Sequence, residues 1–178
     1  QGNWFDAVSG SAILEGPVET HEAFFVSHHA SQWLRRQADG YQPFFLRVDV
    51  WGPHPPYLVA PPFVDSIKTQ DISRYPNFDS NLQHRPDHHQ DYQEYWSEEL
   101  AFNWSQWKQQ LARCHEHSAL VDSAMGRILL TLNQTKQAQN TIVIYTSDHG
   151  DAIASNGGIA NKGALMVEET CRIPLIIR

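Results

Sequence analysis

The chain has 178 residues, of which 41% are hydrophobic, and this is enough for one domain with a buried core. A formal net charge of −7, without any Lys/Arg-rich run, argues against a general nucleic-acid surface. No apolar run approaches the roughly 20 residues that cross a membrane, so we expect no membrane segment. The two cysteines, Cys114 and Cys171, form neither a disulfide framework nor a CxxC metal pair.

The first half of the chain predicts a loop, a helix and a strand, in that order. Residues 1–19 contain Gly, Ser and Pro with little periodicity and are typical of a loop. Thr20 is expected to cap a helix that continues to about Gln37, because apolar residues follow it at helical spacing. Residues 44–50, FFLRVDV, are nearly all apolar and predict a central strand.

A proline-rich loop follows this predicted strand. Residues 51–57, WGPHPPY, contain three prolines that remove backbone donors and stiffen the chain. We therefore expect His54 to be presented on a rigid support at the carboxyl end of the strand. Residues 58–90 are rich in Pro, Asp, Asn and His and predict a long ordered excursion.

The second half predicts one long helix and two further strands. Apolar residues at three-four spacing over 104–132 indicate an amphipathic helix of roughly 40 Å, at 1.5 Å per residue, that covers the sheet. Residues 141–147 and 173–177 predict strands on either side of an irregular segment. This order of elements is an α/β pattern, and no domain boundary is evident, so we expect a single domain over 1–178.

The strongest chemical signal lies where the strand predicted over 141–147 ends. TIVIYTSDHGD delivers Asp148 and His149 to the carboxyl edge of an α/β sheet, where such folds place their ligands. Asp and His both ligate metals, and Gly150 allows the backbone to turn immediately afterwards. An Asp that caps the next turn beside a hydrogen-bonded His is the alternative interpretation.

Lys162 and His54 supply candidate partners for an anionic substrate. Lys162 precedes Gly163 in a glycine-rich loop and could meet an anion as a point charge. Each residue alone is typical of a surface side chain. A metal, a lysine and a histidine around a tetrahedral anion suit sulfuryl or phosphoryl transfer, if the two strands are neighbours in the sheet.

The remaining histidines are not spaced as metal ligands. His28-His29 and His88-His89 are adjacent, and His115 and His117 are two residues apart, so neither spacing shares a helix face. We interpret them as solvated or locally hydrogen-bonded side chains.

Together these motifs resemble the main domain of the sulfatase family, in the alkaline-phosphatase-like superfamily. Residues 43–57 resemble its strand with a Pro-His-x-Pro loop, and 113–129 resemble the helix with an Asp-x-x-x-Gly-Arg pattern, here Asp122 to Arg127. TIVIYTSDHGD, GGIANKG and EETCRIPLIIR resemble the metal strand, the lysine loop and the next strand. The resemblance implies a three-layer α/β/α fold with a mostly parallel sheet, incomplete in this chain.

The resemblance also implies roles for individual residues. In such enzymes the positions of Asp148 and His149 help to bind a divalent cation, usually Ca²⁺. The position of Lys162 touches the sulfate and the leaving oxygen. The position of His54 binds the sulfate as well and can act as an acid. Asn156 stands where many relatives have a histidine, and we assign it no role.

One part of the family pattern is missing from the chain. Sulfatases use a Cys or Ser in a Cys/Ser-x-Pro-x-Arg motif, oxidised to formylglycine, and no proline here has Cys or Ser two residues before it. The Asp-Asp metal pair near the nucleophile is missing as well. We therefore expect a partial domain, a fragment that is inactive alone, binds a divalent cation weakly and self-associates through exposed sheet edges.

The function expected for the parent is metal-dependent hydrolysis of a sulfate ester, with a sulfated sugar or a small aryl or alkyl sulfate as substrate. Two alternatives remain open at this point. One is a phosphonate or phosphodiester hydrolase of the same superfamily, and the other is a non-catalytic binding module that retains the fold.

Overall fold

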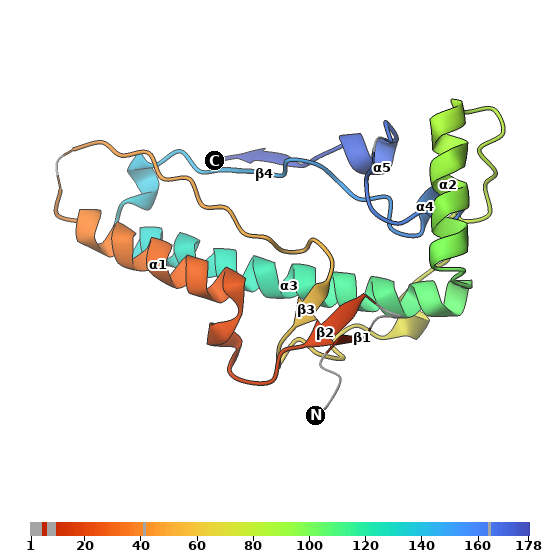
Figure 1. Ribbon diagram of the computed structural model, residues 1–178. Helices are drawn as coiled ribbons and strands as arrows, with labels where there is room; N and C mark the ends of the chain where they lie inside the picture. Colours follow the sequence, from red (N-terminus) through yellow and green to blue (C-terminus); the bar gives the residue numbers. More distant parts are fainter. Residues whose placement is uncertain (1–4, 7–9, 41, 164) are drawn as a thin grey trace. The chain divides into compact units, whose positions relative to one another are not determined.

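The computed structural model describes residues 5–6, 10–40, 42–163 and 165–178 (Figure 1). Its helices are α1 (Glu22–Gln37), α2 (Asp87–Glu99), α3 (Trp104–Gln134), and the single turns α4 (Ser155–Gly158) and α5 (Glu168–Cys171). Short 3₁₀ turns are η1 (Val18–Thr20), η2 (Thr69–Asp71) and η3 (Ala138–Asn140). The strands are β1 (Phe5–Asp6), β2 (Ser11–Ile13), β3 (Tyr57–Val59), β4 (Ile144–Thr146) and β5 (Leu175–Ile177).

The chain folds into two units, each built from two separate stretches of sequence. Unit 1 comprises Gln1–Thr69 and Ala112–Thr141, and unit 2 comprises Gln70–Leu111 and Ile142–Arg178. Unit 1 holds the sheet β1-β2-β3, and unit 2 holds the ribbon β4-β5. Strands β2 and β3 are parallel, whereas the pairs β1-β2 and β4-β5 are antiparallel. Among the described residues, no helix combines the length and apolar character of a membrane span.

The core of unit 1 forms where α1 and α3 pack together beside β3. Phe24 of α1 and Leu120 and Val121 of α3 are buried in one cluster. Burial of a side chain such as Phe24 contributes about 1.5–3 kcal/mol. Glu116 of α3 is also fully buried, and its carboxylate accepts from the backbone N–H of Ile67 (3.2 Å). These contacts hold the chain after β3 against α3.

The core of unit 2 lies beneath the segment between β4 and β5. One cluster contains Leu82, Ile159 and Leu165, with Tyr92 and Trp96 of α2 packed against it. A second cluster is centred on Trp107, which is 1% exposed. Side chains from 148–168 therefore reach into the core, although the backbone there has little regular structure.

The cap of helix α1 lies one position after the predicted cap. Its N-cap is His21, whose ring nitrogen Nδ1 accepts from the backbone N–H of Ala23 (3.1 Å). The hydroxyl of Thr20 instead donates to the carbonyl of Pro17 (2.8 Å). The prediction that Thr20 caps the helix is wrong, because η1 places this hydroxyl toward the preceding turn.

The strand predicted over 44–50 has extended backbone but belongs to no ladder among the described residues. Exposure alternates along it, with Phe45 exposed and Phe44 half-buried, as the period of an extended chain requires. Further on, helices α2 and α3 are separated at Ala101, whose φ of 48° is left-handed and interrupts the helical path. The long helix predicted over 104–132 is α3.

Candidate active site

Asp148 and His149 lie in a tight turn immediately after β4. The backbone N–H of His149 donates to Oδ1 of Asp148 (3.0 Å), and the hydroxyl of Ser147 donates to the carbonyl of His149 (2.8 Å). The strand thus delivers both side chains at its carboxyl end, as the sequence predicts.

The imidazole of His149 has a tautomer set by the backbone. Its Nδ1 lies 2.8 Å from the carbonyl oxygen of Gly150, which can only accept, so Nδ1 carries the proton. The lone pair of a neutral ring is then on Nε2, which lies 3.5 Å from Oδ2 of Asp148. Two electron-rich atoms that face each other are stabilised by a cation or a proton near both.

This arrangement fits two ligands of a divalent cation. Ligands about 2.4 Å from a cation and at right angles to each other are about 3.4 Å apart, close to the spacing observed here. Hard cations require several more oxygen ligands. Within the described part of the chain, no group of three or more His, Cys, Asp or Glu side chains could hold a metal. Asp148 and His149 could therefore supply only part of a cation site.

The charge state of Asp148 suits such a site. Desolvation by its neighbours raises the pKa of this exposed carboxyl, but the attraction of His149 and the backbone N–H and Ser147 donors outweigh that effect. The net result is a lowered pKa, so the side chain remains a carboxylate over a wider pH range.

Gly150 allows helix α5 to approach the Asp-His turn. Its N–H donates to the carbonyl of Thr170 (2.9 Å), and a Cβ at this position would lie 2.0 Å from the carbonyl oxygen of Glu169. Only glycine fits against this backbone. The residue that ends the motif therefore has a packing role that its sequence position alone does not reveal.

Lys162 lies between two residues with left-handed backbone, Asn161 (φ 66°) and Gly163 (φ 45°). The side chain of Asn161 accepts from the N–H of Lys162 (3.1 Å), and the carbonyl of Asn161 accepts from the N–H of Ala152 (3.0 Å). The second bond ties the lysine loop to the residues that follow Asp148 and His149. Within unit 2 the structure thus connects the segments that carry three of the four predicted site residues.

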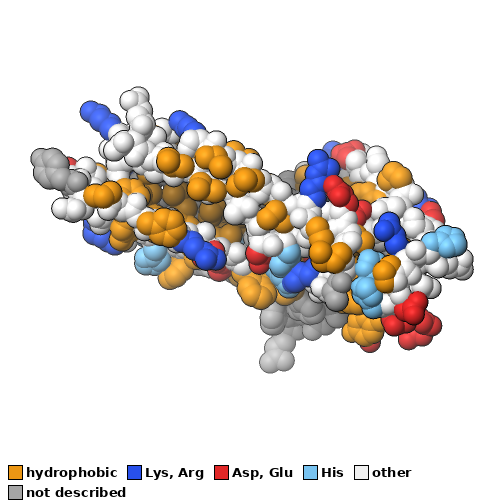
Figure 2. Space-filling model, turned by 90° about the horizontal axis from the view of Figure 1, so that it is seen from above, with side chains coloured by type: hydrophobic (Ala, Val, Ile, Leu, Met, Phe, Trp, Pro, Cys, Tyr) orange, Lys and Arg blue, Asp and Glu red, His pale blue; other side chains and the backbone are white. Residues whose placement is uncertain are grey.

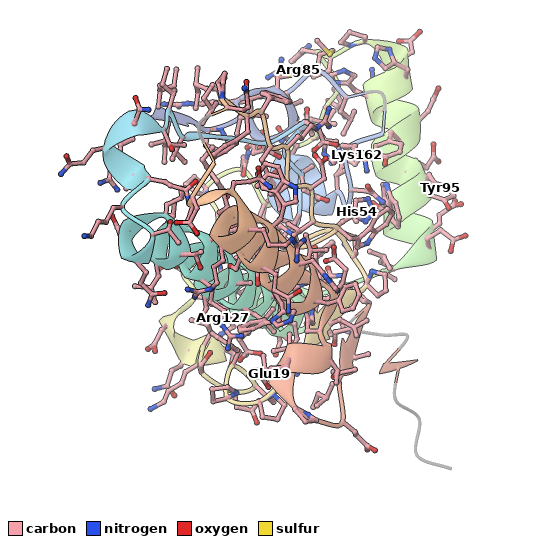
Figure 3. The ribbon with its side chains drawn as sticks, turned by 90° about the vertical axis from the view of Figure 1, so that its left-hand side faces the viewer. Glu19, His54, Arg85, Tyr95, Arg127 and Lys162 are labelled. Atoms are coloured by element: carbon pink, nitrogen blue, oxygen red, sulfur yellow. The ribbon has the colours of Figure 1, made fainter. Side chains whose placement is uncertain are left out.

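Tyr92 of α2 supports the lysine loop and was not identified from the sequence. A Cβ on Gly163 would lie 2.4 Å from Cζ of Tyr92, so the ring packs directly against the glycine. Figure 3 shows Lys162 on the loop beside α2. The sequence signal was weak, because Tyr92 is one of several aromatic residues on α2 and lies 71 positions before Gly163.

A second unrecognised group centres on Glu169. Its carboxylate accepts from the side-chain amides of Asn77 (2.8 Å) and Asn156 (3.0 Å). Burial raises the pKa of Glu169, but its own backbone N–H and the Asn156, Asn77 and Ser155 donors lower it overall. Asn156, to which the sequence assigned no role, therefore links α4 to α5.

His54 belongs to unit 1 and is described there by itself. Its Nδ1 lies 2.6 Å from the carbonyl oxygen of Pro55, so Nδ1 carries the proton and Nε2 the lone pair of the neutral ring. The ring lies 4.9 Å from that of Trp51. These contacts orient the imidazole, in agreement with the rigid support expected from the prolines.

The loop that carries His54 rests on a buried histidine. A Cβ on Gly52 would lie 2.6 Å from Nε2 of His117, which is 2% exposed. Neither ring nitrogen of His117 has a hydrogen-bond partner among the described residues. The interpretation of His117 as a solvated or hydrogen-bonded histidine is therefore wrong, because its ring fills space between α3, the loop and His21.

The chain resembles known proteins along most of its length. The family model for sulfatases matches residues 21–178. The uncharacterized sulfatase YidJ of Escherichia coli is 28% identical over 153 residues, which are 86% of this chain and 30% of that protein. A sulfatase of Formosa agariphila is 30% identical over 165 residues, 90% of this chain and 32% of the relative. The chain thus spans about a third of the length of these relatives.

A solved structure defines the class of fold. The phosphonate monoester hydrolase of Silicibacter pomeroyi superposes with a TM-score of 0.80 at 19% identity, covering 98% of this chain and 36% of that one. The alkaline-phosphatase-like α/β fold expected from the sequence is therefore confirmed. Because the family model covers residues 21–178, the chain belongs to the sulfatase family. Sulfatases generally use a metal ion and a formylglycine, whereas the individual roles of the site residues stay predictions.

Proposed function

We propose that the protein containing this chain hydrolyses sulfate esters, with a sulfated sugar or a small aryl or alkyl sulfate as substrate. In this proposal Asp148 and His149 hold a divalent cation, and Lys162 and His54 contact the sulfate. The cation, Ca²⁺ in our proposal, would neutralise negative charge on the sulfate oxygens when bound.

One observation carries the proposal beyond family membership. Nε2 of His149 faces Oδ2 of Asp148 at 3.5 Å, directly after a strand, in the segment to which the Lys162 loop is hydrogen-bonded. This is a half-site for a cation connected with a flexible ammonium group, the combination that holds a tetrahedral anion.

The protonation of His54 follows from the acceptor at its Nδ1. Sulfate oxygens accept hydrogen bonds, so Nε2 must also carry a proton to donate to a sulfate. His54 would then bind the sulfate as a cation and could pass this proton to the departing oxygen. Lys162 would stabilise the negative charge that develops on the same oxygen.

The nucleophile in this proposal is formylglycine from a Cys/Ser-x-Pro-x-Arg segment outside the sequence given. The 178 residues contain no such motif, so we expect no turnover of sulfate esters by this chain alone.

The test uses a protein that contains this chain together with such a motif, assayed on matched aryl sulfate, phosphodiester and phosphonate esters. We expect sulfate hydrolysis to exceed the other two activities and to fall at least 100-fold in Lys162→Ala and in His54→Ala. Lys68→Ala, at an exposed position, is the matched control and should retain activity. A preference for phosphodiesters or phosphonates would replace the proposal by the alternative within the superfamily.

Titration of this chain with Ca²⁺ by calorimetry tests the cation half-site separately. Two ligands should give binding no tighter than about millimolar, and Asp148→Asn should remove it, since hard cations need several oxygen ligands. Sub-micromolar binding would show that the missing ligands are not needed. Binding that Asp148→Asn leaves unchanged would place the cation elsewhere.

A further inference from the structure

Helix α5 is in direct contact with the turn that carries Asp148 and His149. The backbone N–H of Gly150 donates to the carbonyl of Thr170 (2.9 Å), and a Cβ on Gly150 would collide with the carbonyl oxygen of Glu169. Nδ1 of His149 donates in turn to the carbonyl of Gly150 (2.8 Å). The direction of the His149 ring therefore depends on the peptide at Gly150, and the position of that peptide depends on α5.

Helix α5 is too short to keep this position by itself. It is one turn of four residues, and an isolated turn of helix is unstable in water, because few backbone bonds offset the cost of ordering it. The buried hydroxyl of Thr170 donates to the carbonyl of Leu165 (2.7 Å), a bond within the same segment of chain. The side chain that ties α5 to other segments of unit 2 is Glu169.

The carboxylate of Glu169 uses both of its oxygens for these links. Oε1 accepts from Nδ2 of Asn77 (2.8 Å), and Oε2 accepts from Nδ2 of Asn156 in α4 (3.0 Å). The carbonyl of Asn77 also accepts from the N–H of Gly157 in α4 (2.9 Å). Asn77, α4 and α5 thus form a closed ring of hydrogen bonds, which resists the displacement of any one member.

Helix α2 supports this ring from outside. Nε2 of Gln93 in α2 donates to the carbonyls of Ser80 (2.9 Å) and Asn156 (3.3 Å). A Cβ on Gly157 would collide with the same nitrogen, so α4 packs directly against this side chain. Figure 1 shows α4 beside α2. The ring is therefore attached to a helix of 13 residues, which gives α5 a fixed reference.

The charge of Glu169 is used within the ring. Burial raises the pKa of Glu169, but its own backbone N–H and the Asn156, Asn77 and Ser155 donors lower it overall. The side chain is thus a carboxylate with an amide donor at each oxygen. This arrangement suits an anchor better than a ligand or a base, both of which need an oxygen turned toward the substrate or the cation.

We propose that Glu169 is a positioning residue for the cation half-site. Its carboxylate fixes α5, and α5 fixes the turn on which Asp148 and His149 face each other. The inference rests on the proposed function for the identity of the ligand. The geometry of the turn, however, can be measured without any cation, so the two can fail separately.

The test is nitrogen-15 NMR of the His149 imidazole in this chain at about pH 8, where imidazole is neutral in water. The unchanged chain should show the Nδ1–H tautomer, because Nδ1 donates to the carbonyl of Gly150. Glu169→Gln offers one acceptor oxygen in place of two, so one Asn amide meets an NH₂ group and α5 shifts. We expect the population of the Nε2–H tautomer to rise about fivefold, the factor that corresponds to the loss of one ordinary hydrogen bond.

Glu168→Gln is the matched control. Glu168 is the preceding residue of α5, and its exposed carboxylate accepts from the exposed Arg172 (3.2 Å). The same chemical change there should leave the tautomer of His149 as it is. If Glu169→Gln does not fold, Asn77→Ala removes one donor from the ring and keeps the charge. It should shift the tautomer in the same direction.

Calorimetric titration with Ca²⁺ of a protein that contains this chain and the nucleophile motif gives a second readout. Glu169→Gln should weaken binding about tenfold, as the loss of outer contacts around metal ligands does, and Glu168→Gln should not. An unchanged His149 tautomer in folded Glu169→Gln or Asn77→Ala would overturn the proposal, and so would an equal effect of Glu168→Gln. A changed tautomer together with Ca²⁺ binding that Asp148→Asn does not affect would support the positioning of the turn and overturn the proposed cation site instead.

Discussion

His21 and His117 meet inside unit 1 in a T-shaped arrangement, with their ring centroids 5.2 Å apart. The hydrogen bonds of His21 fit a neutral ring with its proton on Nε2. Its Nδ1 accepts from the N–H of Ala23, so Nε2 must donate to the carbonyl of Leu58 (3.1 Å). It therefore joins the start of α1 to β3. His117 makes no such bond among the described residues and fills space under Gly52.

This pair predicts loss of stability in acid. Burial first, and then the charge that His21 can carry, lower the pKa of His117 from 6.5 to about 4. The folded state favours the neutral ring of His117. The stability that this preference contributes is fully present above pH 6.5 and is lost as the pH falls toward 4. The loss from His117 reaches about 3 kcal/mol, at 1.36 kcal/mol per pKa unit.

Urea unfolding at pH 7.5 and pH 5 measures this effect. His117→Leu should reduce the difference in the free energy of unfolding between pH 7.5 and pH 5, because the variant has no buried imidazole to protonate. His115→Leu, at an exposed position on the same helix, should leave the difference unchanged. An unchanged pH dependence in His117→Leu would assign the acid sensitivity to other groups.

Two glycines of the recognised motifs should respond to alanine in opposite directions. Gly150→Ala places a Cβ 2.0 Å from the backbone oxygen of Glu169, which can move only with α5. We expect a loss of about 1–3 kcal/mol in the free energy of unfolding. Gly126→Ala in α3 meets nothing within 4 Å and should stabilise the helix by up to about 1 kcal/mol. Denaturant midpoints measure both, and equal effects would contradict the close approach at Gly150.

At the scale of elements, the sequence predicts what depends on local pattern. The apolar spacing over 104–132 is found as α3, and the strand before Asp148 is found as β4, although shortened to Ile144–Thr146. The turn after β4 and the loop around Lys162 are also where the motifs indicate. Helix periodicity and strand-end motifs are properties of neighbouring residues, which explains this agreement.

Contacts between distant segments were not predictable in the same way. Tyr92 packs against Gly163, and Asn77 bonds to Glu169, across separations of 71 and 92 positions. No local pattern marks either pair. The same reason applies to residues 44–50, because a strand needs a partner that the segment cannot specify by itself.

The cap of α1 gives a test at this scale. His21→Ala removes both the bond from Ala23 and the bond to Leu58, and should lower the free energy of unfolding by about 1–3 kcal/mol. Thr20→Ala should cost less than about 0.5 kcal/mol, since its hydroxyl is exposed and bonds to the carbonyl of Pro17, just before η1. Thermal unfolding of the two variants compares them. A larger effect of Thr20→Ala would restore it as the cap.

At the scale of the whole molecule, exposed apolar surface is concentrated on β4 and β5. All three residues of each strand are exposed, including Ile144 and Ile176 at 61% each. Figure 1 labels β4 on the segment that pairs with the C-terminal strand, and Figure 2 shows exposed hydrophobic side chains among the polar ones. A two-stranded ribbon is marginal alone, and its outer edges have no strand partner among the described residues. Both its faces and its edges can therefore pack against a further surface.

We therefore expect this chain to self-associate through the ribbon as its concentration rises. Ile176→Lys puts a charge on β5 and should shift association, followed by light scattering, to at least tenfold higher concentration, since a lysine on an edge strand opposes pairing with another chain. Leu130→Lys is the matched control, because Leu130 is similarly exposed (55%) but lies on α3 and not on the ribbon. If Leu130→Lys had the same effect, association would follow net charge, and the ribbon would not be the contact. A strict monomer at high concentration would show that the exposed apolar strands are too short to hold two copies together.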